Sequence, residues 1–164
     1  MGKTLQHLSS SEKDTIHFGR KLASHLKPGD IVCLFGDLGS GKTTFVKGLA
    51  QGLKIKHTQV NSPTFILMNV YEGGSTGSPL SLYHFDLYRL QNPQEILAIG
   101  YEEFFYGDGV AVIEWADKLG PLLPKEYLSV VLTHQTPNKR LIKFEGVGKS
   151  CRELMENFDS GVRK

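Results

Sequence analysis

Apolar residues recur along the chain with two spacings, one typical of helices and one typical of buried strands. Between a serine-rich start at 9–11 and Pro28, apolar residues recur at helical spacing, which predicts a helix there. Continuous apolar runs at 31–35 and 110–113 are typical of strands covered on both faces. The other expected elements are a strand at 4–8, a helix at 42–52, extended segments at 65–71 and 80–87, short helices from 92 and at 101–106, a hairpin of 128–133 with 141–144, and a weak terminal helix at 153–158. This order predicts one three-layer α/β domain with a mixed central sheet, spanning residues 1–164.

A glycine-rich stretch, Gly-Asp-Leu-Gly-Ser-Gly-Lys-Thr-Thr, joins the strand at 31–35 to the helix at 42–52. It matches G-x-x-x-x-G-K-[ST], in which glycines let successive backbone N–H groups turn onto phosphate oxygens. Lys42 would reach the β- and γ-phosphates, and the Thr43 hydroxyl would ligate Mg²⁺. The preceding strand and following helix argue against an accidental match, so we expect a P-loop NTPase-like domain. The predicted nucleotide-binding residues here are Asp37, Leu38, Gly39, Ser40, Gly41, Lys42, Thr43 and Thr44.

An acidic residue, Glu114, follows the apolar run at 110–113. In open α/β sheets ligands bind at the carboxyl ends of the strands, so Glu114 is expected beside the phosphate loop as a partner of nucleotide-bound Mg²⁺. The alternative is an acid that only caps the next helix. Trp115, the single tryptophan, is more typical of core or interface packing than of catalysis.

A second polar run, Tyr-His-Phe-Asp-Leu-Tyr-Arg, occupies residues 83–89. Strand alternation places His84, Asp86 and Tyr88 on one face. Asp86 could ligate Mg²⁺ through water or orient the attacking water, with His84 as its hydrogen-bond partner. The alternative is the solvated outer face of an antiparallel hairpin.

Two further features concern the nucleotide. Ser62-Pro63-Thr64 follows the phosphate-loop helix, where a hydroxyl residue can sense the γ-phosphate, although local evidence alone favours an ordinary proline-containing loop. A guanine-reading Asn-Lys-x-Asp element is absent, because Leu141 stands where its aspartate would be needed after Asn138-Lys139-Arg140. ATP is therefore favoured over GTP.

The composition restricts the classes of protein to which this chain can belong. Hydrophobic residues make up 40% and charged residues 22%, and the net charge of +2 is too small to argue for nucleic-acid or membrane binding by its field. Two cysteines give no disulfide framework. No stretch has the length of a membrane span and no secretory signal is evident, so a cytoplasmic protein is expected.

Taken together, these blocks resemble the TsaE family, small bacterial ATPases of tRNA threonylcarbamoyladenosine synthesis, from about residue 5 to residue 144. The matching blocks are residues 36–44, Ser-Pro-Thr-Phe at 62–65, His-Phe-Asp-Leu-Tyr-Arg at 84–89 and Glu-Trp at 114–115. Ser40 departs from the family, which usually carries alanine there.

The resemblance implies ATP and Mg²⁺ as cofactors and slow hydrolysis by the protein alone. It implies two partner proteins related to each other, one of them the transferase that modifies the adenosine beside the anticodon of ANN-decoding tRNAs. Contact with tRNA would run through that complex, with no membrane involved, and hydrolysis would reset the complex between turnovers.

By matching positions, the resemblance also assigns roles to residues. Lys42, Asp86 and Glu114 would be catalytic, and Thr43, Glu114 and Asp86 would form the metal site. Glu12 and Arg140 would contact the adenosine end. The expected switch or partner residues are Ser62, Pro63, Thr64, Phe65, His84, Tyr88, Arg89 and Trp115.

Two other functions remain open at this point. A small-molecule kinase would use the same loop but normally adds an arginine-bearing lid, and the chain has only five arginines. A nucleotide-gated binding module with incidental hydrolysis would share every feature of the loop.

Overall fold

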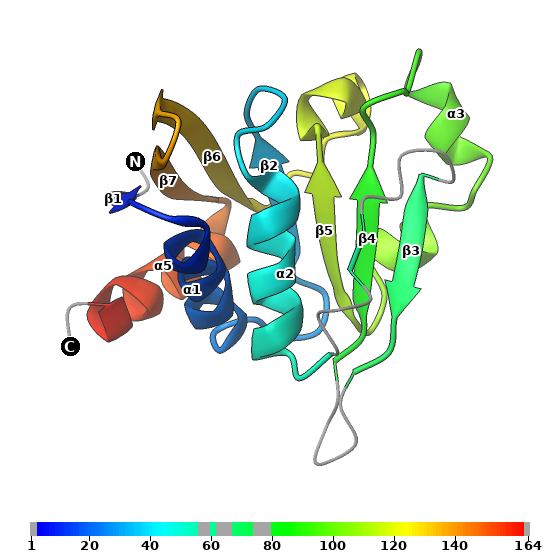
Figure 1. Ribbon diagram of the computed structural model, residues 1–164. Helices are drawn as coiled ribbons and strands as arrows, with labels where there is room; N and C mark the ends of the chain where they lie inside the picture. The colour runs from blue at the N-terminus through cyan, green and yellow to red at the C-terminus, as the bar shows by residue number, and fades with distance from the viewer. Residues whose placement is uncertain (1–2, 56–59, 62–66, 74–79, 163–164) are drawn as a thin grey trace.

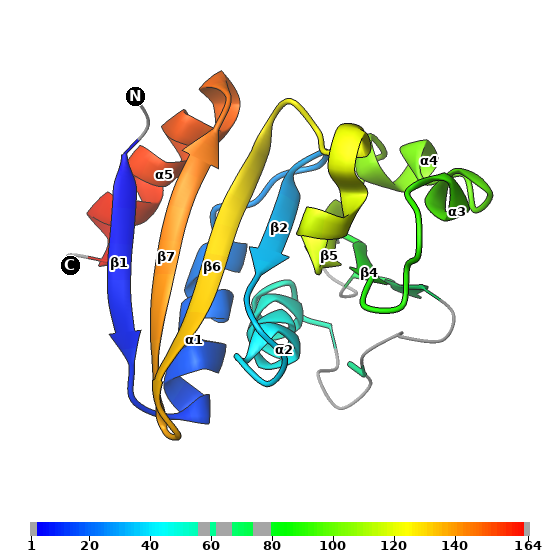
Figure 2. The same ribbon diagram turned by 90° about the horizontal axis from the view of Figure 1, so that it is seen from above.

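The computed structural model describes residues 3–55, 60–61, 67–73 and 80–162. These residues form a seven-stranded mixed sheet with the order β1-β7-β6-β2-β5-β4-β3 (Figures 1 and 2). The strands are β1 (Thr4–Ser9), β2 (Ile31–Phe35), β3 (Met68–Tyr71), β4 (Leu82–Asp86), β5 (Val110–Glu114), β6 (Tyr127–Thr136) and β7 (Lys139–Val147). The four central strands β6, β2, β5 and β4 run parallel, whereas β7 pairs antiparallel with β6, β1 with β7, and β3 with β4.

Helices cover both faces of this sheet. One face carries α1 (Glu12–Ala23), α2 (Lys42–Gly52) and α5 (Lys149–Val162), and the other carries the short α3 (Gln94–Leu97), α4 (Glu102–Phe105) and the 3₁₀ segment η2 (Ala116–Leu122). Each pair of layers encloses its own apolar cluster, because alternate residues of the buried strands point to opposite faces. The expected three-layer α/β domain is confirmed. No helix in the described ranges is long and apolar enough to cross a membrane.

The pairing of α1 with α2 is unusually close. A Cβ built on Gly48 of α2 would lie 2.1 Å from the Ile16 carbonyl oxygen of α1, and one on Gly19 would lie 2.4 Å from the Phe45 carbonyl oxygen. Glycine at both positions is what lets the two backbones touch. At its start, α1 is capped by the Ser11 hydroxyl, which accepts a hydrogen bond from the Asp14 amide at 3.1 Å. The starts of the two helices lie close together, since Glu12 and Thr44 line one cavity.

Several element boundaries differ from the expected ones. The terminal helix is much longer than 153–158, and its inward-packing residues at helical spacing already begin at Cys151. The β6–β7 hairpin also extends beyond 128–133 and 141–144. Of the expected segment at 65–71, the structure describes a strand from Met68, and residues 62–66 lie outside the described residues.

Candidate nucleotide-binding site

The phosphate loop has the backbone geometry that its glycines predicted. Gly36, Gly39 and Gly41 have φ values of 148°, 79° and 105°, where a Cβ would be strained. At Gly36 a Cβ would also lie 2.5 Å from the Leu132 carbonyl oxygen of β6. The loop turns sharply out of β2, and Gly41 forms the N-cap of α2. The amide groups at the start of α2 therefore face the same space as the loop.

The Lys42 side chain lies inside the loop and is only 4% exposed. Its Nζ donates to the carbonyl oxygens of Gly36 at 2.6 Å and Asp37 at 2.9 Å, and lies 3.4 Å from the Ser40 hydroxyl. It also lies 4.1 Å from the centroid of the Trp115 ring, a cation–π distance. Burial lowers the pKa of Lys42, and the nearby carboxylates of Glu114 and Asp86 partly oppose that change. The loop thus holds a cation at the position where the motif predicted one.

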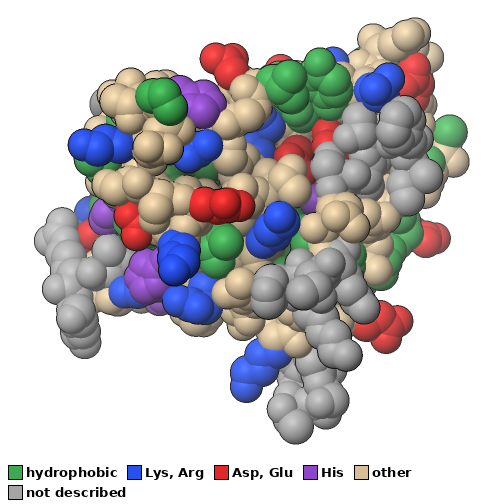
Figure 3. All heavy atoms as spheres, viewed as in Figure 1, with side chains coloured by type: hydrophobic (Ala, Val, Ile, Leu, Met, Phe, Trp, Pro, Cys, Tyr) green, Lys and Arg blue, Asp and Glu red, His purple; other side chains and the backbone are tan. Residues whose placement is uncertain are grey.

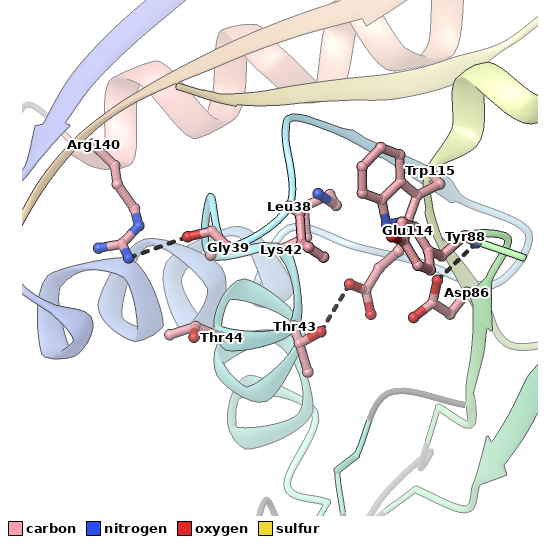
Figure 4. Close-up of a pocket in the computed structure, with 11 residues that line it drawn as sticks. Leu38, Gly39, Lys42, Thr43, Thr44, Asp86, Tyr88, Glu114, Trp115 and Arg140 are labelled. Atoms are coloured by element: carbon pink, nitrogen blue, oxygen red, sulfur yellow. Dashed lines mark hydrogen bonds between the residues drawn. The ribbon is translucent and has the colours of Figure 1, made fainter. Parts of the chain in front are cut away.

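Glu114 ends β5 directly opposite the start of α2 and is 3% exposed. The Thr43 hydroxyl donates to Glu114 Oε1 at 2.8 Å (Figure 4). Because the hydroxyl proton is committed to the carboxylate, the oxygen lone pairs of Thr43 remain available to a cation. The alternative in which Glu114 only caps the next helix is wrong: its carboxylate binds the phosphate-loop helix.

His84 and Asp86 are buried on β4, so the interpretation of this strand as a solvated hairpin face is also wrong. His84 is fully buried and Asp86 is 3% exposed. His84 Nε2 lies 2.6 Å from Glu114 Oε2, so its hydrogen-bond partner is Glu114 and not, as we expected, Asp86. Asp86 Oδ1 accepts a hydrogen bond from the Tyr88 amide at 3.0 Å. The register pairs Asp86 with Glu114, which places two carboxylates at one edge of the sheet.

Two aromatic side chains form one wall of the site. The Trp115 and Tyr88 rings lie 5.1 Å apart, centroid to centroid. Trp115 has the left-handed backbone conformation, with φ 58° and ψ 44°, which turns the chain sharply after Glu114. Lys118 Nζ donates to the Tyr88 carbonyl oxygen at 2.5 Å. Trp115 is half-buried, in agreement with the expected packing role. Its ring packs against the Lys42 side chain.

Two neighbouring cavities open around the loop. The first, of about 320 Å³, lies between the loop, the carboxylates and the aromatic wall (Figure 4). Figure 3 shows acidic side chains in a hollow beside a hydrophobic patch above α2. The first cavity is lined by Leu38, Gly39, Gly41, Lys42, Thr43, Thr44, Asp86, Tyr88, Glu114, Trp115 and Arg140. The second, of about 610 Å³, is lined by Ser10, Ser11, Glu12, Thr44, Pro137, Asn138 and Arg140.

Thr44 and Arg140 line both cavities and therefore mark the boundary between them. A terminal guanidinium nitrogen of Arg140 donates to the Gly39 carbonyl oxygen at 3.5 Å. The Nε of Arg140 is buried and has no hydrogen-bond partner among the described residues. Glu12 and Arg140, which are 128 positions apart in sequence, meet in the second cavity. Pro137 and Asn138 were not anticipated, although the turn that they form directly precedes Arg140.

Not every expected residue joins the site. Arg89 is exposed and lines neither cavity. Ser62, Pro63, Thr64 and Phe65 lie outside the described residues, so the expected switch stays a prediction. Within the described ranges, no group of three or more His, Cys, Asp or Glu side chains could enclose a metal ion. Mg²⁺ usually binds through one or two carboxylates together with substrate phosphates, and the donors here suit that mode.

The P-loop fold is defined by a glycine loop between a buried parallel strand and a helix, with an acidic residue on the neighbouring strand facing the loop. A solved structure of Bacillus subtilis YdiB shares this fold with a TM-score of 0.79 and 33% identity, covering 98% of this chain and 97% of that one. Residues 9–142 match the family described as "Threonylcarbamoyl adenosine biosynthesis protein TsaE".

Similar proteins carry the same name. The chain is 40% identical to the tRNA threonylcarbamoyladenosine biosynthesis protein TsaE of Bacillus subtilis, over 95% of this chain and 94% of that protein. It is 39% identical to the TsaE protein of Rickettsia typhi, over 93% and 96% of the two chains. The chain therefore belongs to the TsaE family.

Proposed function

We propose that this protein is a Mg²⁺-dependent ATPase of the cytoplasm that supports threonylcarbamoyl modification of the adenosine beside the anticodon in ANN-decoding tRNAs. It acts with a transferase complex of two related proteins, through which it meets tRNA. The observation that carries the ATPase proposal is the hydrogen bond from Thr43 to Glu114 at the mouth of the phosphate loop. Family membership supports the pathway.

The two cavities suit the two halves of ATP. The first offers Lys42 and the amides of the loop to the phosphates, and the second offers polar groups from α1 and the β6–β7 turn to the adenosine. Arg140 stands between them, where its guanidinium can meet the phosphate closest to the ribose. Among the described residues that line the two cavities, none is a guanine-reading aspartate next to Asn138, which supports ATP as the nucleotide.

The residues around the first cavity suit a Mg²⁺ ion that binds together with the nucleotide. The Thr43 hydroxyl and the Asp86 carboxylate would hold the ion, and Glu114 would orient Thr43. When bound, Mg²⁺ neutralises the charge that develops on the transferred phosphoryl group. Lys42 would stabilise the same charge, and Asp86, which lines the same cavity, would orient the attacking water. Trp115 and Tyr88 exclude bulk water from one side.

A small-molecule kinase is less well supported. The described residues that line the two cavities include one arginine, Arg140, and it lies at the boundary toward the second cavity.

The deciding experiment measures ATP hydrolysis by the protein alone, with the two partner proteins, and with the partners plus tRNA. Modified tRNA is counted in the same reactions. We expect slow hydrolysis alone, stimulation by the complex, and multiple rounds of modification only with hydrolysable ATP. Support of multiple rounds by a non-hydrolysable ATP analogue would establish the binding-module alternative and overturn our proposal.

A further inference from the structure

The Glu114 carboxylate is held at both of its oxygens by two different elements. Thr43, on α2, donates to Oε1 at 2.8 Å, and His84, on β4, lies 2.6 Å from Oε2. A carboxylate cannot rotate about its terminal bond without breaking both contacts. A series of hydrogen bonds from His84 through Glu114 to Thr43 therefore fixes the orientation of the Thr43 hydroxyl. It also fixes the direction of the lone pairs on that oxygen.

The fold alone does not explain a histidine at this position. His84 is fully buried, and its other ring nitrogen, Nδ1, has no partner among the described residues. Two residues earlier on the same face of β4, Leu82 is fully buried in the apolar core. An apolar side chain at position 84 would leave no unpaired ring nitrogen, so apolar packing alone does not favour a histidine there. What the histidine provides is a donor aimed at Glu114.

We propose that His84 is a positioning residue for the Mg²⁺ site, acting only through Glu114. Nε2 carries the proton in this contact, because a carboxylate oxygen can only accept. His84 contacts neither cavity. The inference rests on the proposed function, since it concerns the cation that accompanies ATP. Replacing residues that orient metal ligands in this way typically lowers metal affinity or activity by roughly 10–100-fold.

The test compares ATP affinity in Mg²⁺ with ATP affinity in EDTA for each variant, by calorimetry. The ratio of the two affinities measures the cation's contribution without relying on turnover. In His84→Leu we expect this ratio to fall about tenfold, whereas the affinity in EDTA stays unchanged. In Leu82→Val, the matched control on the same strand face, the ratio should equal that of the wild type although stability falls.

Two polar replacements keep the test decisive if His84→Leu does not fold. The His84→Gln amide nitrogen occupies roughly the place of Nε2, so it should restore most of the ratio. The His84→Asn amide is too short to reach Glu114 and should behave as His84→Leu does. Equal ratios for the glutamine and asparagine variants would overturn the positioning role.

A double-mutant cycle separates action through Glu114 from any independent effect. Adding His84→Leu to Glu114→Gln should lower the ratio no further, and additive losses would overturn the inference. Wild-type protein whose ATP affinity is the same in Mg²⁺ and EDTA would overturn the proposed function itself. A wild-type protein that needs Mg²⁺, together with an unaffected His84→Leu variant, would overturn the inference alone.

Discussion

Replacing Gly48 by alanine tests the close pairing of α1 with α2. The added Cβ would lie 2.1 Å from the Ile16 carbonyl oxygen and 3.0 Å from the Gly19 Cα, whereas ordinary contact begins at 3.4 Å. Both obstructing atoms belong to the backbone of α1, so no side-chain rotation relieves the overlap. The helix must move by more than about 1 Å, a displacement that a close-packed interior resists.

The size of the effect follows from two opposing contributions. Overpacking of a well-packed interior lowers the free energy of unfolding by about 1–3 kcal/mol. Because backbone atoms obstruct the new Cβ, we expect a cost at the upper end of that range. Alanine gains roughly 1 kcal/mol over glycine in helix propensity. We therefore expect the free energy of unfolding to fall by about 2 kcal/mol. For a chain of this length that corresponds to a melting temperature lower by roughly 4–8 °C.

Urea and thermal unfolding of Gly48→Ala measure this loss, with Gly161→Ala as the matched control. Gly161 is an exposed residue of α5, where a Cβ would approach only the edge of the His25 ring, at 3.3 Å. That variant should equal or slightly exceed the wild type in stability. Because α1 carries Glu12 into the second cavity, Gly48→Ala should also weaken ATP binding. Wild-type stability in Gly48→Ala would refute the described contact between the helices.

Four further predictions concern the site and the cysteines. Lys42→Ala should weaken ATP binding strongly, because it removes the cation inside the loop, whereas Glu114→Ala should reduce Mg²⁺-dependent hydrolysis more than affinity. Equal affinity losses, with hydrolysis per bound ATP unchanged, would contradict this division. In a competition titration at matched Mg²⁺, ATP should outcompete GTP, and displacement of ATP by GTP at equal or lower concentration would disprove the base preference. Asp86→Ala should keep ATP affinity within about tenfold, roughly 1.4 kcal/mol. It should abolish multiple rounds of tRNA modification, and normal multiple turnover would remove Asp86 from the mechanism. Burial raises the pKa of the Cys151 thiol to about 11 and raises that of Cys33 as well. At pH 8 both thiols stay protonated, so alkylation should be slow in the native protein and fast in guanidinium chloride. Rapid alkylation of the native protein would show that the thiols are accessible.

The phosphate loop could be predicted from the sequence because its geometry is local. Gly36, Gly39 and Gly41 have the positive φ values that the motif requires, and the strand before them is apolar enough to be recognised by itself. The position of Glu114 followed from a general property of parallel sheets, since ligands bind at the carboxyl ends of their strands.

The pairing of His84 with Glu114 could not be predicted, because it depends on the register of β4 against β5. That register places His84 opposite Val112 and Asp86 opposite Glu114, and no pattern within either strand specifies it. The length of α5 is a different case. Its apolar residues recur at helical spacing from Cys151, so the signal was present, but the polar start at Lys149 concealed it.

The division of the site into two cavities matters for the selectivity of inhibitors. Phosphate loops have the same chemistry in many unrelated proteins, so compounds that mimic phosphates discriminate poorly among them. The second cavity is built from Ser10, Ser11 and Glu12 on one side and from the turn before Arg140 on the other, none of which belongs to the loop motif. A small molecule that fills this cavity would contact residues outside the loop motif and, with ATP bound as we propose, would compete with the base of the nucleotide.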